Sequence, residues 1–336
     1  MDSITHLALG SCMGEAFAAK KLGRKAMLWG AVAQSVPDID FVSSLWMDTP
    51  SGLLAHRGFT HSFLFCAIIV PLLALLAERW HRPHNISLNK WMLFFGGVIF
   101  AHIFMDAFNN YGVGWLEPFS HERISFNAIY VADPFFALWP GIACIALVYL
   151  RPRLAVRKKW WLMGLLLPAL YLSYCLVNKA KIDSDVREIL KEQHISYTRY
   201  FTTPAPLQNW LWYVVAGNDS GYYTGFRSLF DEQRKIEFHY FPRNDSLLFP
   251  VLSTEPLLKL IRFSRQYYTV EKWNDTLVFN DLRFGQIIGW QNPRGKFVFH
   301  YYLEHPGGNK LVVQRGRFEG WNWQVFTALL KRIRGN

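Results

Sequence analysis

Histidine and aspartate recur in this sequence beside long apolar stretches, where ionisable side chains are uncommon. Residues 56–62 read HRGFTHS and lead directly into the uncharged stretch 63–77. Residues 102–106 read HIFMD and close another apolar stretch, with His102 and Asp106 four positions apart on one helix face. Imidazole and carboxylate groups held together are typical ligands of zinc and other first-row divalent ions.

The same residue types mark the ends of three further apolar segments. Asp2 and His6 open the first, PDID (37–40) closes the second, and Asp133 precedes Pro134 at the start of another. Ionisable groups at membrane depth are costly and are functional by default, so we expect them to converge on one site. Several carboxylates leave room for a second ion. The candidate ligands are Asp2, His6, Asp38, Asp40, His56, His61, His102, Asp106 and Asp133.

The stretch HRGFTHS must turn as it enters the membrane, because His56 and His61 are too far apart for one helix face. Gly58 would permit that turn. Arg57 would then be free to bind a substrate phosphate through its two-pronged guanidinium, and Arg123 is a second candidate for this role. His61 has an alternative role as a general acid or base.

Ordinary structural roles compete with each assignment. Aspartate at a helix start is a common N-cap, which would account for Asp2 or Asp133. A histidine near a membrane surface is more often interfacial than a ligand, and Arg57 could extend its charged end toward the interface. His81 and His84 lie in a basic loop, and we expect them to be solvated.

Over the whole chain of 336 residues, 51% of the residues are hydrophobic and 18% are charged. The apolar residues are concentrated in the first half of the chain. This distribution predicts a transmembrane metal-site domain over residues 1–180. Gly10 and Gly14 predict a close helix contact, and Glu15 should face protein or the basic end of the bundle. The first two of six candidate spans are short for a bilayer, which needs about 20 residues. The six segments are 4–19, 26–42, 59–77, 91–108, 132–150 and 160–177.

Basic side chains are gathered in alternate connections, at 20–25, 78–90 and 151–159. Short basic loops remain in the cytoplasm. The sequence therefore predicts a multi-pass protein of the bacterial inner membrane, with its N-terminus and C-terminal domain on the periplasmic side. The net charge of +11 is explained largely by these loops and does not indicate nucleic-acid binding. The acidic start of MDSITHLALG argues against a cleavable signal peptide, and the four dispersed cysteines argue against a disulfide framework.

Alternating patterns and turn signals replace the apolar runs after residue 180, which predicts an extracytoplasmic α+β domain with an antiparallel sheet over 181–336. We expect helices at 254–266 and 323–334. The expected strands lie within 210–230, 236–241, 267–281, 296–304 and 310–321.

The ordered motifs resemble the bacterial inner-membrane metal-dependent hydrolases of the YdjM type. The resemblance covers about residues 1–215 and runs through DxxxH, PDxD, HRGxTHS, HxxxD, a YG…PFSxxR stretch (111–123) and a final DP. It implies a divalent-metal hydrolase. A looser similarity joins the set to zinc-dependent phospholipase C and single-strand nucleases, but the HxxxE of that group is absent from residues 1–215, which carry the other motifs. Family members often have an acid near position 127, where this chain has Asn127.

We therefore expect a membrane-embedded hydrolase that uses one or two divalent ions at the outer interface. Zinc is the favoured ion, with Mn²⁺ and Mg²⁺ as alternatives, and a membrane lipid phosphoester is the favoured substrate. Arg57, His61 and Arg123 are the candidate catalytic residues. The non-enzymatic alternative is a metal or proton transporter, and a peptidase is less favoured because HExxH is absent. No nucleic-acid partner is expected, and no oligomeric state is predicted.

Overall fold

A computed structural model describes residues 1–335, except for 82–85, 152–153, 305–308 and 310–318. The chain divides into two compact units. The first comprises Met1–Ser43, Ala55–Cys175 and Pro206–Gln208, and the second comprises Ser44–Leu54, Leu176–Ala205 and Asn209–Asn336.

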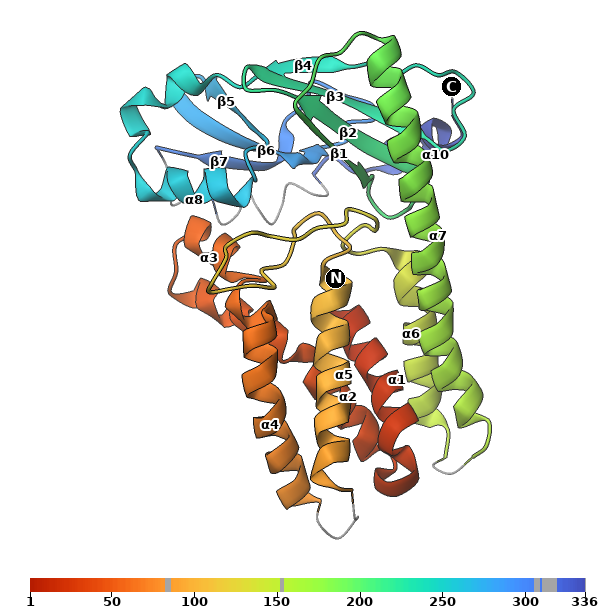
Figure 1. The fold of residues 1–336 in the computed structure, drawn as a ribbon. Coiled ribbons are helices and arrows are strands. Elements are labelled where there is room, and N and C mark those ends of the chain that lie inside the picture. The colour runs from red at the N-terminus through yellow and green to blue at the C-terminus, as the bar shows by residue number, and fades with distance from the viewer. Residues whose placement is uncertain (82–85, 152–153, 305–308, 310–318, 336) are drawn as a thin grey trace. The chain divides into compact units, whose positions relative to one another are not determined.

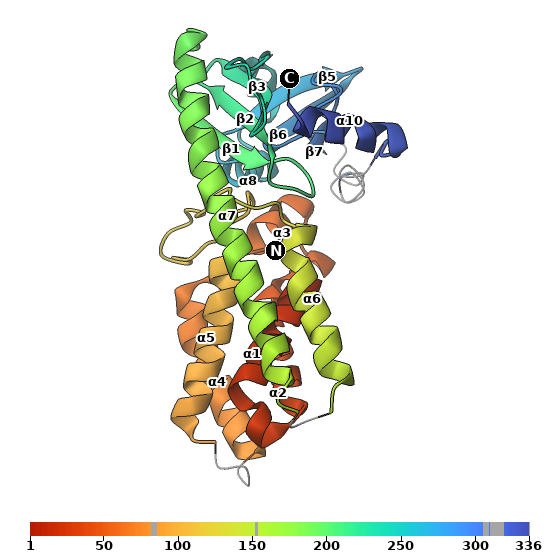
Figure 2. The same ribbon diagram turned by 90° about the vertical axis from the view of Figure 1, so that its right-hand side faces the viewer.

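The first unit is a helical bundle in which α1 packs against α2, α5 and α6, while α4 pairs with α5 (Figures 1 and 2). Short 3₁₀ turns interrupt the longer helices at the end where the predicted ligands gather. The helical elements are α1 (Ser3–Leu22), α2 (Lys25–Ser35), η1 (Pro37–Leu45), η2 (Phe59–His61), α4 (Phe63–Trp80), α5 (Leu88–Asp106), α6 (Pro134–Tyr149) and α7 (Arg157–Glu192).

Three described helices, α4, α5 and α7, are long and apolar enough to cross a membrane, and α6 is apolar but shorter. The prediction of a helical membrane region is therefore confirmed, but six membrane helices are not. The segment expected at 26–42 divides into the 11-residue α2 and the 3₁₀ turn η1, because α2 ends at Ser35 and Pro37 opens the turn two residues later. Eleven helical residues extend about 16 Å, which is roughly half of a bilayer core.

The close contact predicted from Gly10 and Gly14 is confirmed between α1 and α2. A Cβ atom added to Gly10 would run into the carbonyl oxygen of Gly30, and one added to Gly14 would run into that of Ala26. Glycine is therefore needed where the two backbones meet.

The basic end of the bundle also contains buried polar contacts. Glu15 is buried against Arg157, as expected for an acid that avoids lipid. The expectation of a solvated His81 is wrong: its ring is buried and accepts a hydrogen bond of 2.8 Å from the indole of Trp29. The apolar cluster around Trp29 and Trp91 covers this histidine. His84 lies outside the described residues.

The second unit confirms the predicted antiparallel architecture. One sheet has the order β1-β2-β3-β4 and the other has the order β5-β6-β7, with every neighbouring pair antiparallel. Most of the predicted strand at 310–321 lies outside the described residues. The strands and remaining helices are β1 (Arg199–Pro204), β2 (Leu211–Gly217), β3 (Gly221–Ser228), β4 (His239–Pro242), β5 (Tyr268–Trp273), β6 (Thr276–Gln286), β7 (Phe297–Tyr302), α3 (Thr49–Ala55), η4 (Asp245–Val251), α8 (Glu255–Phe263) and α10 (Trp323–Ile333).

Both faces of β2 are covered, which accounts for its unbroken run of buried residues. Trp212 and Val214 pack with Ile182 and Val186 from the second half of α7. Tyr213 and other alternate residues pack toward the three-stranded sheet instead. The period of two along a strand thus allows one strand to pack against a helix and a second sheet.

Candidate metal centre

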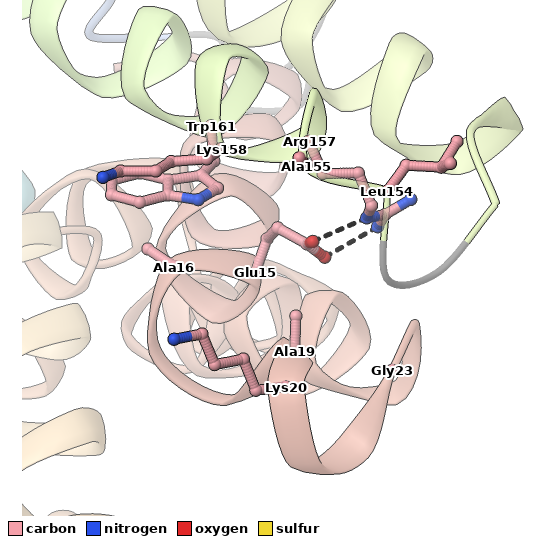
Figure 3. Close-up of a pocket in the computed structure, with 10 residues that line it drawn as sticks. All are labelled: Glu15, Ala16, Ala19, Lys20, Gly23, Leu154, Ala155, Arg157, Lys158 and Trp161. Atoms are coloured by element: carbon pink, nitrogen blue, oxygen red, sulfur yellow. Dashed lines mark hydrogen bonds and ion pairs between the residues drawn. The ribbon is translucent and has the colours of Figure 1, made fainter.

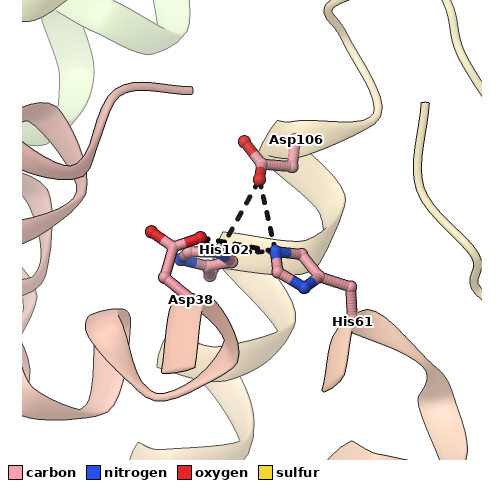
Figure 4. Close-up of side chains that lie close together, drawn as sticks. All are labelled: Asp38, His61, His102 and Asp106. Atoms are coloured by element: carbon pink, nitrogen blue, oxygen red, sulfur yellow. Dashed lines mark hydrogen bonds and ion pairs between the residues drawn. The ribbon is translucent and has the colours of Figure 1, made fainter. Parts of the chain in front are cut away.

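Three separate chain segments bring four potential ligands together in the first unit. Asp38 comes from η1, His61 from η2, and His102 and Asp106 from the last turn of α5 (Figure 4). The spacing of four places His102 and Asp106 on one face of α5. Their side chains and that of His61 are fully buried, whereas the side chain of Asp38 is 16% exposed.

The four ligand atoms outline a small tetrahedron. The Nε2 atoms of His61 and His102 are 3.1 Å apart. Asp38 Oδ1 lies 3.6 Å and 3.5 Å from these nitrogens, and Asp106 Oδ2 lies 3.4 Å and 3.7 Å from them. A tetrahedral zinc ion with ligand distances of 2.0–2.2 Å requires edges of roughly 3.3–3.6 Å. The observed spacing therefore fits one divalent ion at the centre.

The ring of His61 is held by groups on the side away from the tetrahedron. Its Nδ1 lies 3.1 Å from Thr60 Oγ1 and 3.3 Å from Asp40 Oδ2. The Thr60 hydroxyl donates its own hydrogen to Asp40 at 2.9 Å, so its oxygen is available to accept. These contacts favour a proton on Nδ1 and a lone pair on Nε2.

Asp106 divides its two oxygens between different partners. Oδ1 faces the Met1 amino group and lies 3.2 Å from His6 Nε2. The other ring nitrogen of His6 lies 3.3 Å from the side-chain amide of Gln34. Among the described residues, Asp106 Oδ2 has no hydrogen-bond partner, although Arg57 Nε is 3.0 Å away. His6 therefore orients Asp106 while Oδ2 keeps a lone pair for a cation.

The ligand atoms of this group suit a cation. Two imidazole nitrogens and two carboxylate oxygens lie within 4.8 Å of one another, and when both Nε2 atoms carry lone pairs, positive charge between them would relieve their repulsion. Burial alone would raise the pKa of Asp38, but its interactions with His102 and His61 hold that pKa far below its ordinary value. Asp38 thus remains ionised and can act as a metal ligand.

Asp40, from the same turn as Asp38, lies outside the tetrahedron. Its carboxylate accepts the backbone N–H of Arg57 at 2.8 Å and the Nδ1 of His56 at 2.9 Å. Burial alone would raise the pKa of Asp40, but its hydrogen bonds with His56 and His61 outweigh burial, so the pKa is lower than the ordinary value. Asp40 therefore connects both histidines of HRGFTHS without joining the tetrahedral group.

The turn in HRGFTHS depends on Arg57 instead of Gly58. Arg57 has a φ of 59°, whereas Gly58 has a φ of −86°. The Asp40 carboxylate binds the N–H of this left-handed residue. The guanidinium turns inward, is buried, and donates to Asn109 Oδ1 at 2.6 Å and to the Met1 carbonyl oxygen at 3.2 Å. The structure thus places Arg57 beside Asp106 instead of in an open phosphate site.

Asp2 and Asp133 both cap helices. Asp2 Oδ1 accepts the Thr5 N–H at the start of α1. Asp133 Oδ1 accepts two backbone N–H groups at the start of α6, and its other oxygen accepts the Tyr171 hydroxyl at 3.0 Å. Burial raises the pKa of Asp133 to about 6. Neither residue belongs to the tetrahedral group.

Arg123 contacts the loop that contains His56. The side chain of His56 is 40% exposed and its ring centre is 6.3 Å from that of His61. Arg123 is buried and donates to the carbonyl oxygen of His56 at 2.8 Å and to that of Gly112 at 3.4 Å. It therefore holds the loop backbone in place. Asn127 accepts from Ser125 at 2.7 Å and has a left-handed backbone.

Two residues of this network were not singled out by the sequence patterns: Gln34 and Asn109. Asn109 accepts from Arg57 and donates to the carbonyl oxygen of Asp106 at 3.0 Å. Asn109 belongs to the pair NN and lies three residues after HIFMD, and this polar pair beside the motif could have indicated its role. Gln34 is the one amide side chain within KAMLWGAVAQS and follows the apolar run AMLWGAVA, which also could have indicated it.

Comparison with known proteins assigns the family. The sequence model for the YdjM inner membrane protein matches residues 1–182, more than half of the chain. The chain belongs to the YdjM inner membrane protein family. The suspected relationship to the YdjM type is thereby confirmed, and membership with three candidate spans supports an inner-membrane protein. All four residues of the tetrahedral group lie inside the matched YdjM region.

Two curated relatives agree with the YdjM assignment. The chain is 33% identical over 142 residues to the inner membrane protein YbcI of Escherichia coli (strain K12), covering 41% of this chain and 73% of YbcI. It is 30% identical over 159 residues to the uncharacterized protein YfhP of Bacillus subtilis (strain 168), covering 44% of this chain and 46% of YfhP. No solved structure matches the chain.

Proposed function

We propose that this protein is a divalent-metal-dependent hydrolase of the inner membrane that cleaves a phosphoester bond in a membrane lipid. The observation that carries the proposal is the tetrahedron of Asp38, His61, His102 and Asp106, whose donor set and spacing fit zinc. Mn²⁺ and Mg²⁺ are the alternatives. The charge pattern of the loops supports a periplasmic location for the centre and for the second unit.

The four side chains would hold the ion. Because they fill a tetrahedral zinc shell, catalysis requires the site to expand to a fifth position, where the ion would supply Lewis acidity toward a phosphoryl oxygen and activate a water. Asp40 keeps His61 in the tautomer that presents Nε2. Arg57 places a positive charge beside the buried Asp106 and balances part of the negative charge. Together, these residues form a pre-organised and largely buried metal site in which electrostatic effects are strong.

His56 is suited to proton transfer during the reaction. Its Nδ1 is bonded to Asp40, and its side chain is the exposed member of the histidine group. The Nε2 atom could give a proton to a leaving alcohol, with the Asp40 carboxylate stabilising the charged ring. In this proposal, His56 is the general acid, and the buried His61 and His102 bind the ion.

Access at Asp38 supports an amphipathic substrate. Asp38 is the ligand with exposed area, and the adjacent Ile39 is 58% exposed. Ser3 lies 3.5 Å from the second oxygen of Asp38, and its neighbour Ile4 is 79% exposed. Exposed isoleucines around the open ligand favour a lipid with acyl chains over a soluble phosphoester.

A metal or proton transporter is the second candidate, because a buried His/Asp cluster in a membrane protein also suits ion binding. A transporter requires polar groups along a path. In α1, however, the segment between His6 and Glu15 contains no acidic, basic or histidine side chain. The clustering of ligands at one end of the bundle therefore favours the hydrolase.

The test is turnover by detergent-purified, metal-loaded protein with phosphatidylglycerol in mixed micelles and with a soluble phosphodiester. We expect chelator-sensitive release of a phosphorylated product, faster from the lipid. His56→Gln should retain the metal and lose most activity, whereas Asp133→Asn should retain both. No turnover of either substrate by the metal-loaded protein, together with ion uptake into proteoliposomes, would establish the transporter instead.

A further inference from the structure

A pocket with both apolar and charged lining residues lies at the basic end of the first unit, where α1 ends and α7 begins. Figure 3 shows its lining, and its volume is about 610 Å³. Pockets of 300–1,000 Å³ are typical for bound small molecules. The small side chains of Ala16 and Ala19 help to form it, because they leave space along α1.

The pocket contains one ion pair whose groups are fully engaged. The guanidinium of Arg157 binds both oxygens of Glu15 at 2.7 Å. Its remaining nitrogen donates to the carbonyl oxygens of Leu147 and Leu150 at 2.7 Å and 2.6 Å. Glu15 and Arg157 therefore neutralise each other and act as a rigid wall, with little capacity left for a ligand.

The positive charge that remains in the pocket comes from Lys20 and Lys158. Both side chains line it and both residues are exposed. Trp161 lies on the same wall, one turn along α7 from Lys158. Lysines provide mobile point charges for phosphate, and tryptophan is favoured where a membrane meets water.

We propose that this pocket binds the headgroup of an anionic phospholipid, with Lys20 and Lys158 contacting its phosphate and Trp161 beside its glycerol region. The charges of Glu15 and Arg157 cancel, and the charges of Lys20 and Lys158 do not, so the lining carries a net charge of about +2. Its position at the first turns of α7, a candidate membrane span, places a headgroup where acyl chains can continue along apolar helix surfaces.

The experiment compares lipid binding by detergent-purified full-length variants, using native mass spectrometry and thermal unfolding. The test variant is Lys20→Gln with Lys158→Gln. The matched control is Lys25→Gln with Lys90→Gln, which removes the same charge from exposed residues at the same basic end but outside the pocket lining. Phosphatidylglycerol is the probe, phosphatidylcholine tests for charge, and glycerol 3-phosphate tests for a headgroup without acyl chains.

We expect the wild type and the control to retain phosphatidylglycerol and to gain thermal stability from it, with a much smaller effect of phosphatidylcholine. The test variant should lose at least half of the retained lipid and of the stability shift. Equal loss in both variants would show general attraction to the basic loops and overturn the proposal. An equal effect of phosphatidylcholine or of glycerol 3-phosphate would also overturn it.

Discussion

Replacing Asp40 with asparagine should weaken divalent-metal affinity about tenfold while leaving all four ligands in place. Three groups approach Asp40 Oδ2: the Arg57 N–H at 2.8 Å, the Thr60 hydroxyl at 2.9 Å and His61 Nδ1 at 3.3 Å. An asparagine oxygen at that position can still accept from them. The negative charge that favours the correct His61 tautomer is lost, which costs about 1.4 kcal/mol for a tenfold change.

Asp40→Ala removes the acceptor as well as the charge, so its effect should approach the upper value for groups that orient a metal ligand, about 100-fold. Affinity can be measured by competition with a chelating dye in detergent. Asp133→Asn is the matched control, because it makes the same change at a buried carboxylate that caps α6. An Asp40→Asn affinity equal to that of the control would refute the role of Asp40. Complete metal loss would make it a direct ligand.

Three other perturbations test the surrounding structure. Arg57→Lys should keep the metal but lower turnover at least tenfold, because one ammonium cannot replace the contacts with Asn109, Met1 and Asp106; metal loss with normal turnover would contradict this. Glu15→Leu or Arg157→Leu alone should destabilise the protein by about 3–5 kcal/mol and the double variant by much less, and thermal unfolding in a double-mutant cycle would measure the coupling between these buried partners. Asp133→Asn should gain in thermal stability relative to the wild type as pH rises from about 4 to 6.5. The folded pKa of Asp133 is raised to about 6, so the protonated side chain stabilises the wild type at low pH and this contribution is lost as Asp133 ionises. A difference in Tm that does not change with pH would contradict this.

Residue spacing was sufficient to predict which parts of the first unit meet. His102 and Asp106 share a face by helix geometry, and the side assignments of the loops bring PDID and HRGFTHS to the same end. The ligand and the supporting carboxylate within PDID could not be distinguished. Asp38 and Asp40 are two residues apart on a 3₁₀ turn, and their different directions depend on what packs around that turn.

Other roles depended on local backbone geometry. Asp2 and Asp133 were predicted as ligands with a capping alternative, and the structure shows caps because α1 and α6 begin at the next residues. The inward turn of Arg57 follows from its left-handed φ, which a sequence with Gly58 beside it does not suggest. Six membrane helices are not confirmed, and the apolar composition of residues 26–42 could not indicate that α2 ends at Ser35.

The metal content of purified protein tests the central claim most directly. Elemental analysis of the wild type should find at least one divalent ion per chain, with zinc favoured. His102→Ala combined with Asp106→Ala should reduce it by at least one ion per chain while the protein remains inserted in the membrane, and Asp133→Asn should leave it unchanged. A wild-type protein without stoichiometric metal, or a double variant with the same metal content as the wild type, would contradict the account.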